Sequence, residues 1–337
     1  MRLPTTSYAA SSGELREVYD QLRKRAMPVT YRPAHDGVAG VIQAHSLDPQ
    51  LVARVFATSP TLLGTGPLER AERELVASLT SRLDQCFYCT ACHLEFMRDA
   101  LDGDRELALA VITTPHSVPT RSPRLRALAD IATLVTEAPW ALSSVHRDRA
   151  HAAGLDDDAI LQAILIAVFL GHCNRVVDAV GMGLDYTVEI KPPIADPTVP
   201  PFALAPAPFA TRAAIDVARR PAAAAALVAW RSYMFDRDAP LTRRQRTVIA
   251  RWVARWLGDA TISPPDDLTI NPLDDALREL AETITLAPWR LTDASFAKLR
   301  AAGLDDAALF DAVAVASTTG LFSRITVALT AIGRDRT

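Results

Sequence analysis

A carboxylate, two thiols and an imidazole lie within a 20-residue stretch of the chain, as Glu74, Cys86, Cys89 and His93. Cysteine reacts as the thiolate, so a thiol does chemistry only where a neighbouring group takes or withdraws its proton. Imidazole does this at neutral pH, and a carboxylate that holds the imidazole in place completes the usual activated-nucleophile arrangement. The four residues therefore indicate thiol chemistry.

Neither Pro nor Gly interrupts the chain from Cys86 to Leu101, which predicts one helix with Asp84 as its N-cap. At helical spacing Cys86, Cys89 and His93 share one face. We expect Cys86 in the first turn, where the helix dipole lowers a thiol pKa. Two cysteines at this spacing can close a disulfide.

Glu74 belongs to a second predicted helix, Leu68 to Ser81, which ends just before the first cysteine. A short turn at Arg82–Gln85 would fold that helix back along the next one. We expect this to bring the carboxylate to His93 and to form a Glu–His–Cys proton relay.

These residues resemble the alkylhydroperoxidase D-like branch of the carboxymuconolactone decarboxylase superfamily. Further stretches share the resemblance to its peroxidase-related members: residues 13–19, 44–49 and 69–75. The resemblance implies that Cys89 attacks a peroxide and that Cys86 resolves the product as a disulfide. It implies that His93 and Glu74 move the protons.

Around this motif the chain departs from the family pattern or extends it. Tyr88 stands where some members have a histidine, and Cys92 adds a third thiol one turn beyond the second. Asn174-Arg175, two residues after His172, matches an Asn-Arg that the family often has at this place. We interpret Tyr88, Cys92, His172 and Arg175 as substrate-binding candidates. Cys92 and Cys173 also fit the alternative of small buried hydrophobes.

Other functions are consistent with the same residues. A structural zinc site could use the cysteines and His93, but zinc usually takes its ligands from two short segments, so we predict no metal. Glu74 and His93 could instead do acid–base chemistry in a decarboxylase, isomerase or biosynthetic tailoring enzyme. A non-enzymatic thiol redox sensor is a third alternative.

An internal repeat relates the two halves of the chain. Residues 130–184 match residues 279–333 at a constant offset of 149, including the Ala-Pro-Trp at Trp140 and Trp289. Further upstream, residues 67–77 match 240–250 at an offset of 173. At that offset the motif residues map to Thr247, Asp259, Ile262 and Asp266, so the second copy lacks the thiols.

The repeat predicts two tandem domains, apolar residues at helical spacing predict that the fold is all-α, and the resemblance implies that both are alkylhydroperoxidase D-like helical domains. Residues 1–190 form the redox-active domain, 191–208 a Pro-rich linker, and 209–337 the degenerate copy. Asp156 and Asp305 are predicted N-caps, and Gly154 and Gly303 are predicted to end the preceding helices. Two apolar stretches, Ala159–Val168 and Ala308–Ala316, predict buried helices too short to span a membrane.

The net charge of −3, with acidic and basic residues interspersed, argues against a nucleic-acid partner. The N-terminus lacks an apolar signal segment, and cycling thiols suit the cytoplasm. We expect no bound cofactor, no membrane association and an external dithiol protein as reductant. The substrate would be a peroxide or another small molecule. The family resemblance implies a homo-oligomer.

Overall fold

The computed structural model describes residues 1–24, 37–101, 105–120, 122–208, 213–268 and 270–334. Within these ranges every regular element is helical, which confirms the all-α prediction. The α-helices are α1 (Gly13–Arg23), α2 (Gly40–Gln43), α3 (Pro49–Ser59), α4 (Arg70–Leu83), α5 (Phe87–Ala100), α6 (Glu106–Thr113), α7 (Pro123–Glu137), α8 (Ser144–Ala152), α9 (Asp157–Val180), α10 (Pro221–Phe235), α11 (Arg243–Leu257), α12 (Pro272–Leu286), α13 (Ala294–Ala301) and α14 (Asp306–Ala331). Short helical turns are η1 (Pro60–Gly64), η2 (Pro115–Ser117), η3 (Pro139–Ala141), η4 (Val217–Arg219), η5 (Pro265–Asp267) and η6 (Pro288–Arg290).

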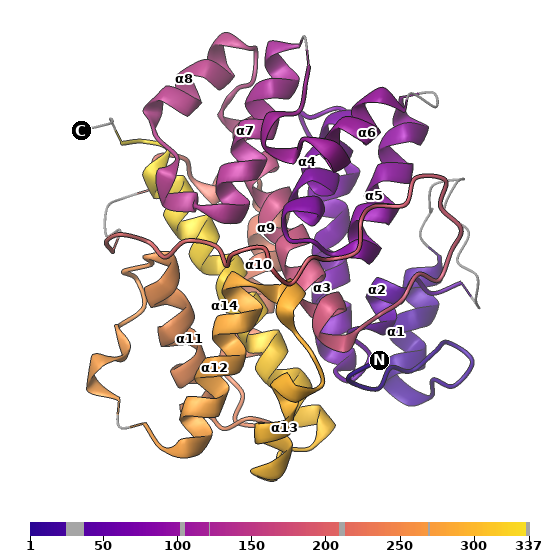
Figure 1. Cartoon of the computed structure of the whole chain (residues 1–337), viewed down its shortest axis with the longest axis vertical. Coiled ribbons are helices and arrows are strands. Elements are labelled where there is room, and N and C mark those ends of the chain that lie inside the picture. The colour runs from indigo at the N-terminus through magenta and orange to yellow at the C-terminus, as the bar shows by residue number, and fades with distance from the viewer. Residues whose placement is uncertain (25–36, 102–104, 121, 209–212, 269, 335–337) are drawn as a thin grey trace.

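Helices α9 and α14 pack against each other at the centre of the molecule (Figure 1). Asp156 and Asp305 cap them, each accepting a backbone N–H bond at 2.8 Å, which confirms both predicted N-caps. The preceding helices end as predicted, because Gly154 and Gly303 adopt the left-handed conformation that glycine tolerates.

Both central helices are longer than the sequence indicated. They run for 24 and 26 residues, long and apolar enough to cross a membrane by length and composition. The prediction that these segments are too short was therefore wrong. Their most apolar windows are 100% and 89% buried inside the protein, because helices of both halves cover them. In this structure the two helices therefore form part of the buried core of the protein.

Helix boundaries follow the repeat found in the sequence. At the offset of 149, α7, α8 and α9 correspond to α12, α13 and α14, and at 173 α4 corresponds to α11. Helices α3 and α10 both start at a proline, 172 residues apart, and pack on each other. Helix α5, which carries the cysteines, has no helical counterpart among the described residues. One hydrophobic cluster includes buried residues of both halves. The division into two domains stays a prediction, and its boundary at residue 209 lies outside the described residues.

Two buried arginines join the halves reciprocally. Arg175 on α9 donates to the carbonyl of Thr285 on α12, at 3.3 Å. Arg324, its repeat counterpart on α14, donates to the carbonyl of Thr136 on α7, at 3.4 Å. Gly171 is retained in both copies for a steric reason, since a Cβ there would lie 2.9 Å from the guanidinium of Arg175.

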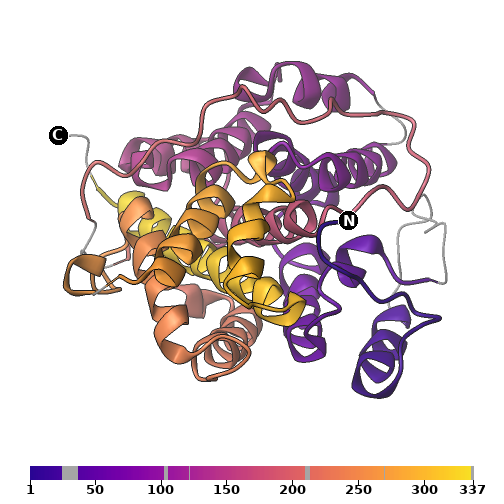
Figure 2. The same cartoon turned by 60° about the horizontal axis from the view of Figure 1, so that its bottom comes forward.

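The Pro-rich segment at residues 191–208 has no regular structure and runs across both halves (Figure 2). Its backbone is tied to the protein at three points. Asp196 donates its N–H to the side chain of Gln85, while Phe202 and Ala205 donate to the carbonyls of Leu286 and Trp256. The segment is therefore packed on the surface that it crosses.

Candidate active site

Helices α4 and α5 lie side by side and carry the four motif residues (Figure 1). The predicted helix boundaries need correction. Helix α5 starts at Phe87 with Cys86 as its N-cap, whereas Asp84 is the C-cap of α4. Cys86 therefore sits just before the first turn, and its side chain makes no capping hydrogen bond.

The turn between the two helices is tightly constrained. Gln85 has φ of 55°, the left-handed region that a residue with a Cβ seldom adopts. The N–H of Cys86 donates to the carbonyl of Ser81 at 3.0 Å. The carboxylate of Asp84 is fully buried and accepts hydrogen bonds from Asn174 and Arg175 on α9, each at 2.9 Å. These contacts fix the position of the first cysteine relative to α9.

Glu74 and His93 meet as the sequence predicted. Oε2 of Glu74 lies 2.7 Å from Nδ1 of His93, and both side chains are nearly buried. When Nδ1 donates to the carboxylate, Nε2 is the ring nitrogen that accepts a proton. The carboxylate thus fixes both the orientation and the tautomer of the imidazole.

An apolar cavity of about 160 Å³ opens beside this pair. Cys89, Cys92, His93 and Tyr88 line it from α5. Its other walls are mostly aliphatic and aromatic, with Phe56 of α3 and Phe169 of α9 among them. Cys89 and His93 therefore face the same enclosed space, where a small, largely apolar molecule would fit.

Cys86 lies behind this cavity and does not line it. Its side chain is 0% exposed. Burial, and then the hydrogen bond to Cys89, raise the pKa of the Cys86 thiol well above its usual value. The predicted lowering of this pKa by the helix dipole was wrong, because loss of hydration disfavours the thiolate more than the helix end stabilises it. The thiols of the pair are nonetheless in contact, and all four cysteines are free.

One residue at the site was missed by the sequence analysis. Asp178, in the last turn of α9, lies close to the Cys86 thiol. Burial raises the pKa of Asp178 to about 7, and the neighbouring Asp84 carboxylate acts in the same direction. Its Oδ2 atom is buried and has no hydrogen-bond partner in the described part of the chain. The only signal in the sequence was an isolated acid in the apolar run Val176 to Val180.

Tyr88 and Cys92 lie at the cavity, as the substrate-binding prediction requires. The hydroxyl of Tyr186 hydrogen-bonds to the carbonyl of Tyr88 at 3.2 Å and contacts the Cys92 thiol. Burial raises the pKa of Cys92 and of Cys173, which also lines the cavity from α9.

His172 and Arg175 lie elsewhere, in the contact between the two halves. Nε2 of His172 is 3.2 Å from Nε2 of His45, and its ring packs edge-on against Trp230. Arg175 forms a buried ion pair with Asp84, at 2.9 Å. Neither lines the cavity, so their predicted contact with substrate does not fit this geometry.

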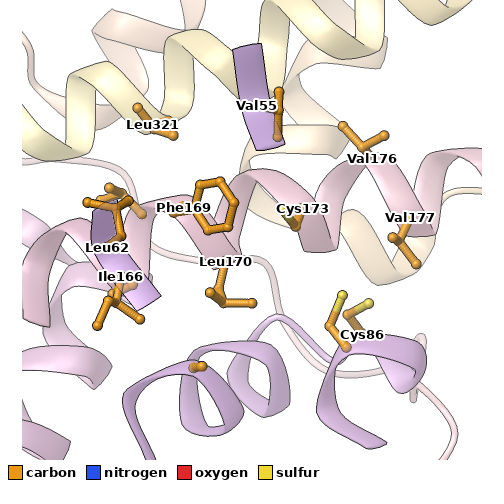
Figure 3. Packing of buried hydrophobic residues seen from close by; sticks show 14 of the residues in the cluster. Val55, Leu62, Cys86, Ile166, Phe169, Leu170, Cys173, Val176, Val177 and Leu321 are labelled. Atoms are coloured by element: carbon orange, nitrogen blue, oxygen red, sulfur yellow. The ribbon is translucent and has the colours of Figure 1, made fainter. Parts of the chain in front are cut away.

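Figure 3 shows how α9 separates these environments. Cys86 lies on one side of the helix and Leu321 of α14 on the other, with Leu170 and Cys173 on α9 between them. All of these residues belong to the hydrophobic cluster that both halves share.

Within the part of the chain that the structure describes, no group of three or more His, Cys, Asp or Glu side chains is placed to hold a metal ion. Among the motif residues, the carboxylate of Glu74 hydrogen-bonds to the imidazole of His93. The cysteines and His93 are thus arranged along a helix and do not enclose a common point.

No protein-family model matches the chain, and no curated protein matches its sequence. The solved structures that are similar to it include two peroxidase-related proteins. One is a peroxidase-related protein from Ralstonia eutropha JMP134 with an alkylhydroperoxidase AhpD core, at 24% identity and a TM-score of 0.47, covering 54% of this chain and 91% of that one. The other is a peroxidase-related protein from Silicibacter sp. TM1040, at 24% identity and a TM-score of 0.41, covering 48% and 94%.

Proposed function

We propose that this protein is a thiol-dependent peroxidase in which Cys89 is oxidised by a peroxide and Cys86 resolves the product. One observation supports this most directly. Cys89 and His93 face one apolar cavity, Glu74 holds the imidazole from behind, and Cys86 contacts Cys89 on the side away from the cavity. A nucleophile, its base, the group that orients the base and a second thiol are thus present together.

The first step oxidises Cys89. His93 accepts the Cys89 proton through Nε2, and the thiolate attacks the distal oxygen of the peroxide, so that the O–O bond breaks. Cys89 becomes a sulfenic acid, and the departing alkoxide takes the proton from His93 and leaves as an alcohol. The apolar cavity walls favour an organic peroxide over hydrogen peroxide.

The second step forms the disulfide. Cys86 gives its proton to Asp178, and the resulting thiolate attacks the sulfur of the sulfenic acid. The S–O bond breaks, and the departing hydroxide takes up the proton that Asp178 received and leaves as water. An external dithiol then reduces the Cys86–Cys89 disulfide by two successive exchanges. Because the pKa of the Cys86 thiol is raised, it needs a proton acceptor, and Asp178 is the carboxylate that contacts it.

Peptide mapping tests the proposal. The reduced protein is treated with one equivalent of cumene hydroperoxide, free thiols are counted, and the intact mass is measured before and after a dithiol reductant. We expect a reversible loss of about 2 Da that maps to Cys86 and Cys89. Four unreacted thiols would exclude a thiol peroxidase.

Turnover measurements separate the alternatives. An acid–base enzyme using Glu74 and His93 would keep its turnover in a Cys86→Ala/Cys89→Ala variant, whereas a peroxidase would lose it. A redox sensor would form the disulfide once but would show negligible peroxide turnover with excess dithiol.

A further inference from the structure

A second cavity lies in the half of the chain that lacks the cysteines. It has a volume of about 750 Å³, within the range of small-molecule sites. It lies between α10, α11 and α14, which are the repeat counterparts of α3, α4 and α9. The candidate active-site cavity is likewise lined by α3 and α9 of the first copy, but by α5 in place of α4.

The lining residues of the two cavities correspond through the repeat. At the offsets of 172, 173 and 149, six residues of the first cavity map onto residues of the second: Phe56 onto Val228, Ser59 onto Arg231, Leu63 onto Phe235, Cys89 onto Ile262, Leu170 onto Thr319, and Cys173 onto Phe322. The second cavity is therefore the degenerate copy of the first. It is also wider, since no helix corresponding to α5 covers it among the described residues.

The chemistry of the lining has changed together with the loss of the thiols. Arg231 replaces a serine and Thr319 a leucine, while Arg243 and Arg251 on α11 also reach the cavity. Hydroxyl groups such as Ser232 add further hydrogen-bond donors. The first cavity is almost entirely apolar, whereas the second presents guanidinium and hydroxyl groups beside an apolar wall.

The guanidinium of Arg231 is available to a ligand. Arg231 forms no ion pair among the described residues, and its guanidinium carbon lies 5.9 Å from the centre of the Phe322 ring. Arg243, nearby, donates to the carbonyl of Asp236 and likewise has no ion-pair partner among the described residues. Two carboxylates also line the cavity. That of Asp259 already accepts hydrogen bonds from Ser323 and Thr261.

We propose that this second cavity binds a small organic carboxylate with an apolar body. Arg231 pairs with the carboxylate, since the planar guanidinium forms two parallel hydrogen bonds to it. Phe322, Phe235 and Val228 contact the apolar part of the ligand. The degenerate half of the chain is therefore a binding site in its own right, independent of the thiol chemistry in the first half.

Saturation-transfer NMR with benzoate tests this inference on the full chain, with benzyl alcohol as the uncharged control. We expect saturable benzoate binding that weakens about tenfold or more in Arg231→Gln, because a charge-assisted hydrogen bond is lost. Arg300→Gln removes the same charge from α13, outside the cavity, and should leave binding unchanged. Arg231→Lys should retain part of the affinity.

Failure to bind benzoate, equal binding of benzyl alcohol, or equal binding by Arg231→Gln would each overturn the inference. Disulfide formation with cumene hydroperoxide is measured in the same variants. It should be unchanged in Arg231→Gln, because this residue lies outside the cysteine cavity. The two proposals therefore succeed or fail separately.

Discussion

The carboxylate of Asp178, near the end of the central helix α9, lies close to the thiol of Cys86. Cys89 has a proton acceptor in the Glu74–His93 pair, on the cavity side of α5. Each of the two thiols in the proposed cycle thus has its own proton acceptor, supplied by a different part of the fold.

Replacing Asp178 by Asn should slow disulfide formation without slowing the oxidation of Cys89. The amide cannot take the Cys86 proton, and general-base contributions are typically about a hundredfold or more. Rapid quenching with a sulfenate trap after a peroxide pulse should show sulfenic acid accumulating in Asp178→Asn. Equal rates of disulfide formation in the variant and the native protein would show that Asp178 is not the base.

The same carboxyl should make the stability of the protein depend on pH. The pKa of Asp178 is about 7 in the folded protein and ordinarily 3.8, so between these values the folded state retains a proton that the unfolded chain has lost. Its stabilising contribution is therefore full below about pH 3.8 and is lost as the pH rises through about 7. The native Tm should fall relative to that of Asp178→Asn between pH 4 and pH 8. A constant difference would contradict the shift.

Replacing Cys86 by Ser should permit one oxidation of Cys89 and then stop the cycle. The sulfenic acid would persist or oxidise further, because the thiol in contact with Cys89 is gone. Mass analysis after excess peroxide gives the oxidation state of Cys89. Cys92→Ser is the matched control, since Cys92 also lines the cavity, and it should cycle normally. If Cys86→Ser turns over at the native rate, another thiol resolves the sulfenate.

Replacing Glu74 by Gln should slow the oxidation of Cys89 by about tenfold to a hundredfold, since the imidazole loses its orienting carboxylate. The measurement is the rate of free-thiol loss at limiting peroxide. Glu72→Gln serves as the control, because Glu72 lies on the same helix but pairs with Arg124. It should change stability and leave the rate unaffected. Equal rates in Glu74→Gln and the native protein would exclude the relay.

Replacing Arg175 by Met should destabilise the protein by about 3–5 kcal/mol, because the Asp84 carboxylate would remain buried without its partner. Denaturant unfolding measures this loss. The corresponding change at Arg300, whose ion pair with Asp306 is exposed, should cost less than about 1 kcal/mol. Similar losses for the two variants would mean that the buried pair contributes little.

Local spacing predicted the motif geometry well. Cys89 and His93 share a helix face because the helical period is fixed, and Glu74 reaches His93 because the turn between the helices is short. The helix start was misplaced by two to three residues, since both Asp84 and Cys86 can cap a helix and only the fold decides between them.

What the sequence could not supply were the contacts made by α9. Every residue of this helix from Ala159 to Val177 is buried, so periodicity does not show which side chain meets which neighbour. Asp178 was missed for this reason. For the same reason His172 was expected to contact substrate, whereas in the structure its ring pairs with that of His45. The direction of the Cys86 pKa shift was wrong for a related reason, because burial depends on the whole fold.

The packing of α9 on α14 limits how this chain can be divided. A truncated protein ending at the linker would leave in water the apolar face of α9 that α14 now covers. Such a fragment would aggregate or pair with a second copy of itself through that face. Anyone expressing the cysteine-bearing half for study should therefore produce both halves together, even though only one of them carries thiols.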